Sequence, residues 1–285
     1  WMLKITDYAE RLLQDLDKLD WPEATKEGQR NWIGKSEGAQ IVFTLRGLNA
    51  SIQVFSTRPD TLYAATFLVL APEHPLVDEV TSSEANETVQ AYRKRALRKS
   101  EVDRKASLEK TRVFTGGFAS HPLTGEAVPI WVADYVLMDY GTGAVMAVPA
   151  HDERDYEFAK NFDLNIRQVI DSKGQDLPFT GEGSVMSSDF LNGLPSKKAA
   201  QVITEHLEEK GLGQKHVQYK LRDWLFSRQR YWGEPFPVVH TRDGSVVGVE
   251  LDELPVTLPE VADYEPSEKG EPPLARAQDW IQYNN

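Results

Sequence analysis

The sequence contains no cysteine, and this absence removes several kinds of chemistry at once. Disulfide bonds, zinc sites built on thiolates and cysteine nucleophiles are all excluded. A chain of 285 residues without disulfides must rely on a buried apolar core, and its 40% of hydrophobic residues are enough to form one. The composition fits a cytoplasmic protein, which is the location we expect.

Long hydrophobic runs are also missing. No apolar run approaches the roughly 20 residues that a membrane helix needs. The first residues, Trp1 to Lys4, do not form a charged segment followed by an apolar one. We therefore expect neither a secretory signal nor a membrane segment.

Positive charge is scarce, with 32 Lys and Arg against 44 Asp and Glu and a formal net charge of −12. Non-specific binding to nucleic acids depends mainly on neutralising phosphates, so a general polyanion binder is disfavoured. One exception is the segment from Arg93 to Arg112, which contains nine basic residues and only three acidic ones. This basic segment is either a solvated helix face or a contact surface for an RNA backbone, and both interpretations stay open.

Hydrophobic periodicity indicates more strands than helices. The expected strands cover residues 40–45, 51–55, 66–70, 127–132 and 143–148. The expected helices cover residues 83–97, 155–162 and 197–210. Because helices interrupt the strands irregularly, we predict an α+β fold: a mixed, β-barrel-like sheet with helices packed outside.

A first motif follows the strand expected at residues 51–55. It consists of Ser56-Thr57-Arg58-Pro59-Asp60-Thr61 and precedes an apolar run. Pro59 restricts the backbone, so the short polar side chains form a compact hydrogen-bonding set. Asp60 or Thr61 could instead simply cap a helix, and this alternative stays open. A cap needs neither three hydroxyls nor an arginine, so we favour a binding pocket.

A second motif covers residues 140–155. A glycine-flanked turn leads into a strand, Pro149 ends that strand, and an acidic cluster opens a helix. Asp152 and Asp155 have the spacing of a capping pair at the positive end of the helix dipole. A carboxylate at such a junction is equally well placed to hold a substrate ammonium group, and both interpretations stay open.

Other kinds of site are less well supported. The Gly141-x-Gly143 pair lacks the third glycine of a dinucleotide site. Adjacent His151 and Asp152 would suit a metal-dependent phosphohydrolase, but the other five histidines lack ligand spacing, so we expect no metal. A lone histidine beside a helix start is more often a structural hydrogen-bonding group. No Gly-x-Ser-x-Gly elbow occurs, so hydrolysis would use a positioned water.

Both motifs resemble those of editing domains in class I aminoacyl-tRNA synthetases. Residues 56–61 resemble the threonine-rich peptide of these domains, and residues 141–155 resemble their second editing motif. The run from Ala144 to Asp155 is similar to the leucyl-tRNA synthetase branch. The flanks agree, since residues 29–34 and 222–233 are similar to the points where the leucyl catalytic domain leaves and re-enters its insertion.

The resemblance implies a division of the chain into three parts. Residues 1–34 would be a helical flank of the catalytic domain, residues 35–220 the editing domain, and residues 221–285 a partly loop-like return into the catalytic domain. The family's ATP-handling signatures, His-x-Gly-His and Lys-Met-Ser-Lys-Ser, do not occur in this sequence. The resemblance implies that editing needs no cofactor and that ATP and Mg would belong only to the synthetic site of a full-length enzyme.

The implied activity is hydrolysis of the ester in tRNA-Leu mischarged with norvaline, isoleucine or methionine. The implied partner is that mischarged tRNA, bound by its 3′ terminal adenosine, and we expect the protein to act as a monomer. One pocket discriminates by only ~1–3 kcal/mol per methylene group, so a second, hydrolytic site is physically reasonable.

The resemblance also assigns roles by position. The predicted catalytic set is Thr57, Arg58, Thr61, Asp152 and Asp155. The predicted substrate-binding set is Ser56, Tyr140, Met146, Val148, His151 and Asp155. Within these sets, Thr61 would collide with the γ-branched side chain of leucine, and Asp155 would bind the α-ammonium group. Ser56 replaces the family's common threonine but keeps its hydroxyl.

Two alternatives compete with the editing interpretation. The chain could be a binding module for an adenosine end with little turnover, which deacylation by the chain alone would reveal. It could also be a metal phosphohydrolase built on His151 and Asp152, which predicts bound metal and loss of activity with a chelator.

Overall fold

The computed structural model describes residues 2–97, 111–138, 141–262, 264 and 273–282. These residues form two compact units, one of residues 34–220 and one of residues 1–33 with 221–285.

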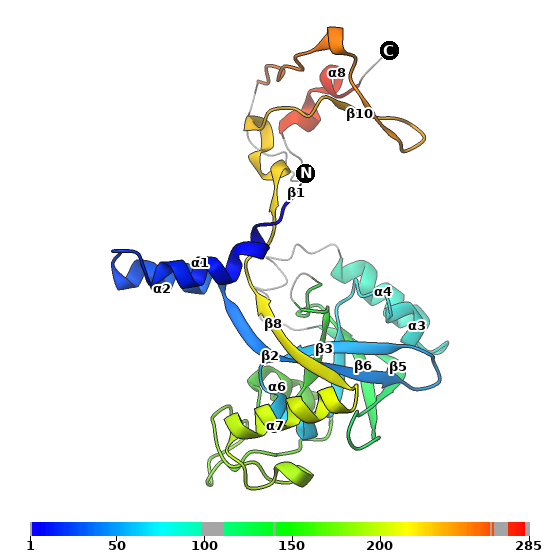
Figure 1. Ribbon diagram of the computed structural model, residues 1–285. Coiled ribbons are helices and arrows are strands. Elements are labelled where there is room, and N and C mark those ends of the chain that lie inside the picture. The colour runs from blue at the N-terminus through cyan, green and yellow to red at the C-terminus, as the bar shows by residue number, and fades with distance from the viewer. Residues whose placement is uncertain (1, 98–110, 139–140, 263, 265–272, 283–285) are drawn as a thin grey trace. The chain divides into compact units, whose positions relative to one another are not determined.

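The larger unit is built on a mixed seven-stranded sheet (Figure 1). Its strands are β2 (Lys35–Leu45), β3 (Ser51–Ser56), β4 (Phe67–Leu70), β5 (Arg112–Ser120), β6 (Ala127–Ala133), β7 (Ala144–Ala147) and β8 (Gly213–Tyr219). The hydrogen-bonded order is β3-β2-β5-β6-β4-β7, with β8 also pairing with β2. β4 and β6 run parallel, and the other paired strands are antiparallel.

The sheet is curved but does not close into a barrel. Among the strands that the structure describes, β3 and β7 end the path and share no ladder. The two strands nevertheless lie close together. The Thr142 hydroxyl, just before β7, donates a hydrogen bond to the Gln53 carbonyl in β3. The α+β class is confirmed, and the barrel-like sheet is an open one.

Helices lie on the outside of this sheet, as expected. They are α3 (Val77–Val80), α4 (Asn86–Ala96), α6 (Glu153–Asn161) and α7 (Ser196–Glu209), with short 3₁₀ turns η2 (Pro59–Ala64) and η3 (Asp189–Leu191). α7 packs against β8 and η2, whereas α3 and α4 pack against β5 (Figure 1). The helices expected at 83–97, 155–162 and 197–210 correspond to α4, α6 and α7.

All five expected strands are present, but β5 and β8 were not predicted. β5 contains Gly116 and Gly117, where the ladder with β6 is irregular between Phe114 and Phe118. A Cβ on Gly117 would lie 2.2 Å from the Val80 carbonyl oxygen, so glycine is required where α3 approaches the strand. β8 pairs with the first part of β2, from Lys35 to Ile41. Its residues are largely polar, so the sequence shows no apolar alternation that would predict a strand.

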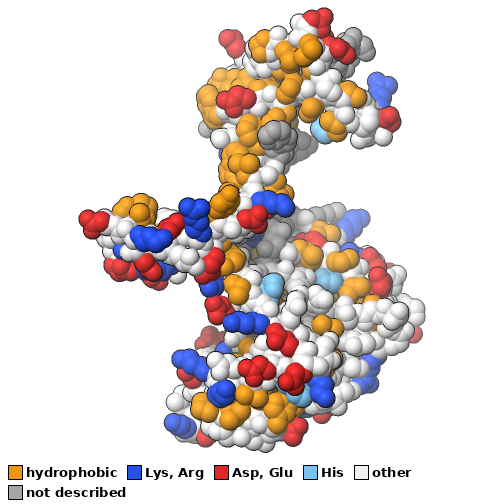
Figure 2. Space-filling model, in the orientation of Figure 1, with side chains coloured by type: hydrophobic (Ala, Val, Ile, Leu, Met, Phe, Trp, Pro, Cys, Tyr) orange, Lys and Arg blue, Asp and Glu red, His pale blue; other side chains and the backbone are white. Residues whose placement is uncertain are grey.

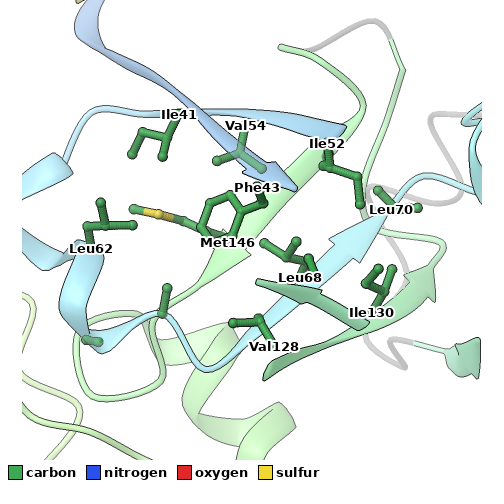
Figure 3. Packing of buried hydrophobic residues seen from close by; sticks show 14 of the residues in the cluster. Ile41, Phe43, Ile52, Val54, Leu62, Leu68, Leu70, Val128, Ile130 and Met146 are labelled. Atoms are coloured by element: carbon green, nitrogen blue, oxygen red, sulfur yellow. The ribbon is translucent and has the colours of Figure 1, made fainter. Parts of the chain in front are cut away.

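The main core lies inside the curve of the sheet (Figure 3). Phe43 lies near its centre, with Met146 beside it and Leu62 from η2 nearby. A second cluster, on the other side of β4, includes Phe67 and Phe158, whose rings stack with centroids 4.5 Å apart. Burial of α6 against this second cluster fixes the start of that helix next to the end of β7.

The smaller unit contains short elements. They are β1 (Met2–Leu3), η1 (Ile5–Tyr8), α1 (Ala9–Leu16), α2 (Glu23–Ile33), β9 (Trp224–Leu225), η4 (Phe226–Trp232), β10 (Val238–His240), β11 (Val246–Gly248), η5 (Leu251–Glu253), η6 (Pro273–Arg276) and α8 (Gln278–Ile281). Acidic and basic side chains intermingle on α1 and α2 (Figure 2). There, Arg30 pairs with Asp17 at 2.8 Å and with Glu23 at 2.6 Å. None of the helices in the described part of the chain is long and apolar enough to cross a membrane.

Only the ends of the basic segment fall within the described residues, since 98–110 lie outside them. Arg93 forms an ion pair with Asp78 at 2.6 Å and donates to the Pro72 carbonyl at 2.8 Å. The Arg112 guanidinium stacks over the rings of Phe158 and Phe162, at 4.3 and 4.1 Å from their centroids. Both arginines therefore make contacts within the protein.

Replacing Leu68 in β4 with alanine tests the position of the core. Leu68 is fully buried between Ile130 and Met146, so Leu68→Ala should lower the free energy of unfolding by about 2–5 kcal/mol. The matched control is Leu48→Ala, in the exposed turn between β2 and β3, which should change it by less than about 0.5 kcal/mol. Urea unfolding followed by circular dichroism measures both, and equal losses would contradict this core.

Candidate functional site

The threonine-rich motif forms the end of β3 and the tight turn η2. Pro59 occupies the first position of this turn, where its fixed φ is favourable and its missing N–H is not needed. The Ser56 hydroxyl accepts a hydrogen bond from the Arg58 N–H at 3.0 Å. Strand β2 runs so close that a Cβ on Gly38 would lie 2.1 Å from the Ser56 carbonyl oxygen. Backbone contacts therefore fix the start of the motif.

Arg58 and Asp60 form a two-pronged ion pair within the motif. The Arg58 Nε lies 3.0 Å from Asp60 Oδ1, and its Nη2 lies 2.8 Å from Oδ2. Asp60 is 1% exposed, whereas about a third of the Arg58 side chain is exposed. A buried carboxylate needs such a partner, because an unpaired charge would be strongly destabilising there. Asp60 therefore does not serve as a helix cap.

The two threonines of the motif differ in exposure. Thr57 is exposed. Thr61 is completely buried, and its hydroxyl donates to the Arg58 carbonyl at 2.8 Å. Neither threonine caps the turn. Thr57 is accessible to a ligand, whereas Thr61 could limit only the depth that a ligand reaches.

The second motif passes from β7 into α6, and its two aspartates have different partners. Asp152 is the N-cap of α6, because its Oδ1 accepts from the N–H groups of Arg154 at 2.9 Å and Asp155 at 3.1 Å. The Asp155 side chain instead turns back to β7, where Oδ2 accepts from the Val148 N–H at 2.8 Å. Asp152 therefore caps the helix, whereas the Asp155 carboxylate bonds to the backbone at the end of β7.

Burial changes the acidity of Asp155. Its side chain is 7% exposed, and this desolvation raises its pKa from 3.8 to about 7. The negative charge of Asp152 contributes to this rise, while the Val148 N–H and the Arg154 charge oppose it. A nearby cation would favour the carboxylate, so this position is well suited to receive an ammonium group.

His151 uses both ring nitrogens to hold backbone. Its Nε2 accepts from the Val169 N–H at 3.0 Å, so the ring proton is on Nδ1, which donates to the Phe179 carbonyl at 2.9 Å. Burial lowers the pKa of His151, in keeping with this neutral form. Although predicted as a substrate-binding residue, His151 offers no unused nitrogen and instead connects separate segments of the chain.

The segment at Phe179 and Thr180 joins the two motifs. Arg58 Nη1 donates to the Thr180 carbonyl at 3.3 Å, and the Phe179 N–H donates to the Ala150 carbonyl at 2.8 Å. His151 also bonds to Phe179, and the charges of Arg58 and Asp60 both affect its pKa. The structure therefore brings both motifs to one place. Sequence reasoning missed the joining segment, because it has no regular periodicity and its groups are backbone carbonyls and amides.

The remaining predicted residues occupy different settings. Met146 is buried in the main core beside Phe43 (Figure 3). Val148 is half-buried and contributes its N–H to Asp155. Tyr140 lies outside the described residues. Met146 supports the site from beneath, and Val148 positions the carboxylate.

Among the residues that the structure describes, no group of three or more His, Asp or Glu is arranged to hold a metal ion. A cavity of about 530 Å³ lies at the other end of α6, lined by residues from Ala159 to Ile166. None of the predicted site residues lines that cavity.

A hydroxyl-rich turn and a buried carboxylate, joined on a mixed sheet, fit the class that the sequence resembles, the editing domains of aminoacyl-tRNA synthetases. A family model described as "Leucyl-tRNA synthetase, editing domain" matches residues 30–208. The chain therefore belongs to the leucyl-tRNA synthetase editing-domain family.

Two relatives support this assignment. The chain is 62% identical over 283 residues to a leucine–tRNA ligase of Bdellovibrio bacteriovorus, which covers 99% of this chain and 35% of that protein. A crystal structure of a leucyl-tRNA synthetase from Agrobacterium radiobacter K84, in a ternary complex with tRNA and LeuAMS, matches with a TM-score of 0.76 and 39% identity. That match covers 100% of this chain and 33% of the other. The chain thus spans about a third of the relatives it matches.

The raised pKa of Asp155 predicts a pH-dependent effect of Asp155→Asn on stability. Between pH 3.8 and about 7 the folded chain holds a proton that the unfolded chain releases, so the carboxyl group lowers stability as the pH rises through this range. The asparagine variant should lack this loss. It should exceed the unmodified chain in stability above pH 7, by at most about 4 kcal/mol, and the gain should shrink toward pH 4.

Urea unfolding at several pH values measures this difference. The control is Glu153→Gln, an exposed change in the same helical turn, whose effect should not vary with pH in this way. A constant difference between Asp155→Asn and the unmodified chain would mean that Asp155 is not an uncompensated buried carboxyl group.

Proposed function

We propose that this domain hydrolyses the ester bond of mischarged tRNA-Leu. The observation that best supports this proposal is the joining of the two motifs through Phe179 and Thr180, which brings an exposed hydroxyl and a buried carboxylate into one site. Membership of the leucyl-tRNA synthetase editing-domain family supports the substrate class.

Each residue has a role in this proposal. The Asp155 carboxylate pairs with the α-ammonium group of the attached amino acid and thereby orients the ester. The Thr57 hydroxyl and backbone N–H groups stabilise the oxyanion that develops at the ester carbonyl. The exposed part of the Arg58 guanidinium, held by Asp60, meets the phosphate of the terminal adenosine. A positioned water attacks the carbonyl carbon and releases the free amino acid and the tRNA hydroxyl.

Selectivity would come from the depth of the pocket. Norvaline and methionine are unbranched at the γ-carbon and isoleucine branches at the β-carbon, whereas leucine branches at the γ-carbon. The buried Thr61 then blocks the γ-branched side chain from below. A contact of this kind discriminates by ~1–3 kcal/mol, so leucyl-tRNA would be hydrolysed about 10- to 200-fold more slowly than the mischarged tRNA.

The remaining parts of the proposal concern the full-length enzyme. A leucyl-tRNA synthetase containing this domain would ligate leucine to tRNA-Leu in the cytoplasm, as a monomer, and would use ATP and Mg only at its synthetic site. Editing itself would use no cofactor. The neighbouring synthetase structure contains tRNA, which supports tRNA as the partner.

Shortening Thr61 should remove the protection of leucyl-tRNA. Thr61→Ala deletes the methyl and hydroxyl groups beneath the ligand, so leucine gains room and leucyl-tRNA deacylation should rise about tenfold or more. Thr61→Val is the matched control, because it keeps the branched shape and replaces the hydroxyl with a methyl group. Deacylation of leucyl-tRNA by the 285-residue chain, and by a full-length synthetase carrying it, measures both. Equal rates for the two variants would rule out the steric role.

Removing the Asp155 carboxylate should strongly slow the clearance of mischarged tRNA. A charge-assisted hydrogen bond contributes roughly 1.5–3 kcal/mol, so Asp155→Ala should lower kcat/KM for norvalyl-tRNA by about 10- to 100-fold or more. The exposed change Glu153→Ala in the same turn should leave it unchanged.

The pH profile adds a second readout for Asp155. In the unmodified chain, kcat/KM above the spontaneous rate should rise as Asp155 ionises near pH 7, and the variant should lack this rise. If Asp155→Ala retained full activity, its carboxylate would have only a structural role. If the unmodified chain bound an aminoacyl-adenosine analogue without hydrolysing mischarged tRNA, it would be a binding module.

A further inference from the structure

His121 is a buried histidine with a fully defined hydrogen-bonding role. It is 1% exposed, and its Nδ1 accepts from the N–H groups of Leu123 and Thr124, both at 3.2 Å. Because Nδ1 faces two donors, the ring proton must be on Nε2, which lies 2.9 Å from the Leu62 carbonyl oxygen and donates to it. Burial lowers the pKa of His121, which favours this neutral form.

The turn that carries His121 is closed by its own backbone. The His121 N–H donates to the Glu126 carbonyl, and the Gly125 N–H donates to the His121 carbonyl, both at 2.9 Å. Arg46 at the end of β2 also donates to the Gly125 carbonyl. His121 therefore projects from a rigid turn between β5 and β6.

This turn holds η2 at two successive carbonyl groups. Leu62 directly follows Thr61, and its carbonyl receives the His121 Nε2–H. The next carbonyl, that of Tyr63, receives a hydrogen bond from Arg167 Nη1 at 3.3 Å, while Arg167 Nη2 pairs with Glu126 at 2.8 Å. The His121 side chain and the Arg167–Glu126 ion pair thus set the position of the segment that follows Thr61.

Aromatic packing restricts the His121 ring as well. The ring meets the edge of Phe43 at a centroid distance of 6.1 Å and an angle of 85°, and it lies 6.1 Å from the ring of Tyr63. Inside η2, Thr61 hydrogen-bonds to the Arg58 carbonyl, through its N–H at 3.0 Å and its hydroxyl at 2.8 Å. The hydrogen bonds from His121 and Arg167 therefore reach the two residues directly after Thr61, Leu62 and Tyr63.

We propose that His121 is a positioning residue for leucine exclusion: through the Leu62 carbonyl it fixes the depth at which Thr61 blocks the amino-acid side chain. This inference rests on the proposed editing function and adds to it a residue outside both motifs. Loss of the Nε2–H donor lets η2 move within the core, and small movements matter because the discrimination is steric. The predicted consequence is a loss of selectivity that exceeds the loss of rate.

Two substitutions separate the two halves of the imidazole. The asparagine of His121→Asn keeps an acceptor near the Nδ1 position for Leu123 and Thr124 but is too short to reach Leu62. The glutamine of His121→Gln places its amide N–H₂ near the Nε2 position, where it can donate to the Leu62 carbonyl, but loses the acceptor. Each variant removes one of the two hydrogen-bonding functions of the buried imidazole. A general loss of stability should therefore be similar in both, and each variant serves as the control for the other.

The measured quantity is the ratio of leucyl-tRNA to norvalyl-tRNA deacylation, in the chain and in a full-length synthetase carrying it. His121→Asn should raise this ratio about tenfold, whereas His121→Gln should stay within about threefold of the unmodified protein. Thermal unfolding of both variants shows whether they fold. Equal ratios for the two variants, or an unchanged ratio for His121→Asn, would overturn the proposal.

Arg167→Met keeps the test decisive if both histidine variants fail to fold. The Arg167 side chain is 29% exposed, and methionine preserves its aliphatic part while removing the hydrogen bond to Tyr63. The ratio should again rise, by about threefold or more, and an unchanged ratio would overturn the proposal. If the unmodified protein deacylated neither substrate, the editing function itself would fail, a result distinct from the loss of the His121 effect alone.

Discussion

The buried ion pair between Arg58 and Asp60 is the constraint on which the site depends. Asp60 is almost completely enclosed, so its charge is tolerable only while the guanidinium stays in place. That requirement fixes Arg58, whose remaining nitrogen reaches the Thr180 carbonyl, and the adjacent Phe179 is bonded to His151 and Ala150. One ion pair within a short turn therefore also determines where the second motif lies.

Two neighbouring carboxylates at the N-terminal end of α6 have different roles, one in stability and one in function. Asp152 caps the helix and stabilises it, while Asp155 is buried beside it with one backbone N–H as its partner. Burial and the charge of Asp152 hold the pKa of Asp155 near 7. In the free protein the negative charge of this carboxylate is therefore poorly balanced by positive charge. A substrate ammonium group supplies the missing charge, which links recognition of the amino acid to relief of an unfavourable charge in the free protein.

The sequence predicts the parts of the structure with a local pattern. Apolar alternation located the five expected strands, and the local pattern of polar residues after strands singled out both motifs. It did not reveal β8, whose polar residues resemble a loop until they pair with β2, nor β5, where Gly116 and Gly117 permit the approach of α3. The different uses of Asp152 and Asp155 also escaped prediction, because spacing cannot tell a cap from a side chain that turns back to a strand. Phe179, Thr180 and His121 act through backbone groups distant in sequence, and no local pattern reports such contacts.

The most direct test of the shared site is a crystal structure of the chain with a non-hydrolysable norvalyl-adenosine analogue. The account predicts the α-ammonium group within about 3 Å of the Asp155 carboxylate, the ester replacement beside Thr57, and the norvaline side chain directed toward Thr61. An analogue bound away from Asp155, or a leucyl analogue bound in the same pose at the same depth, would contradict it.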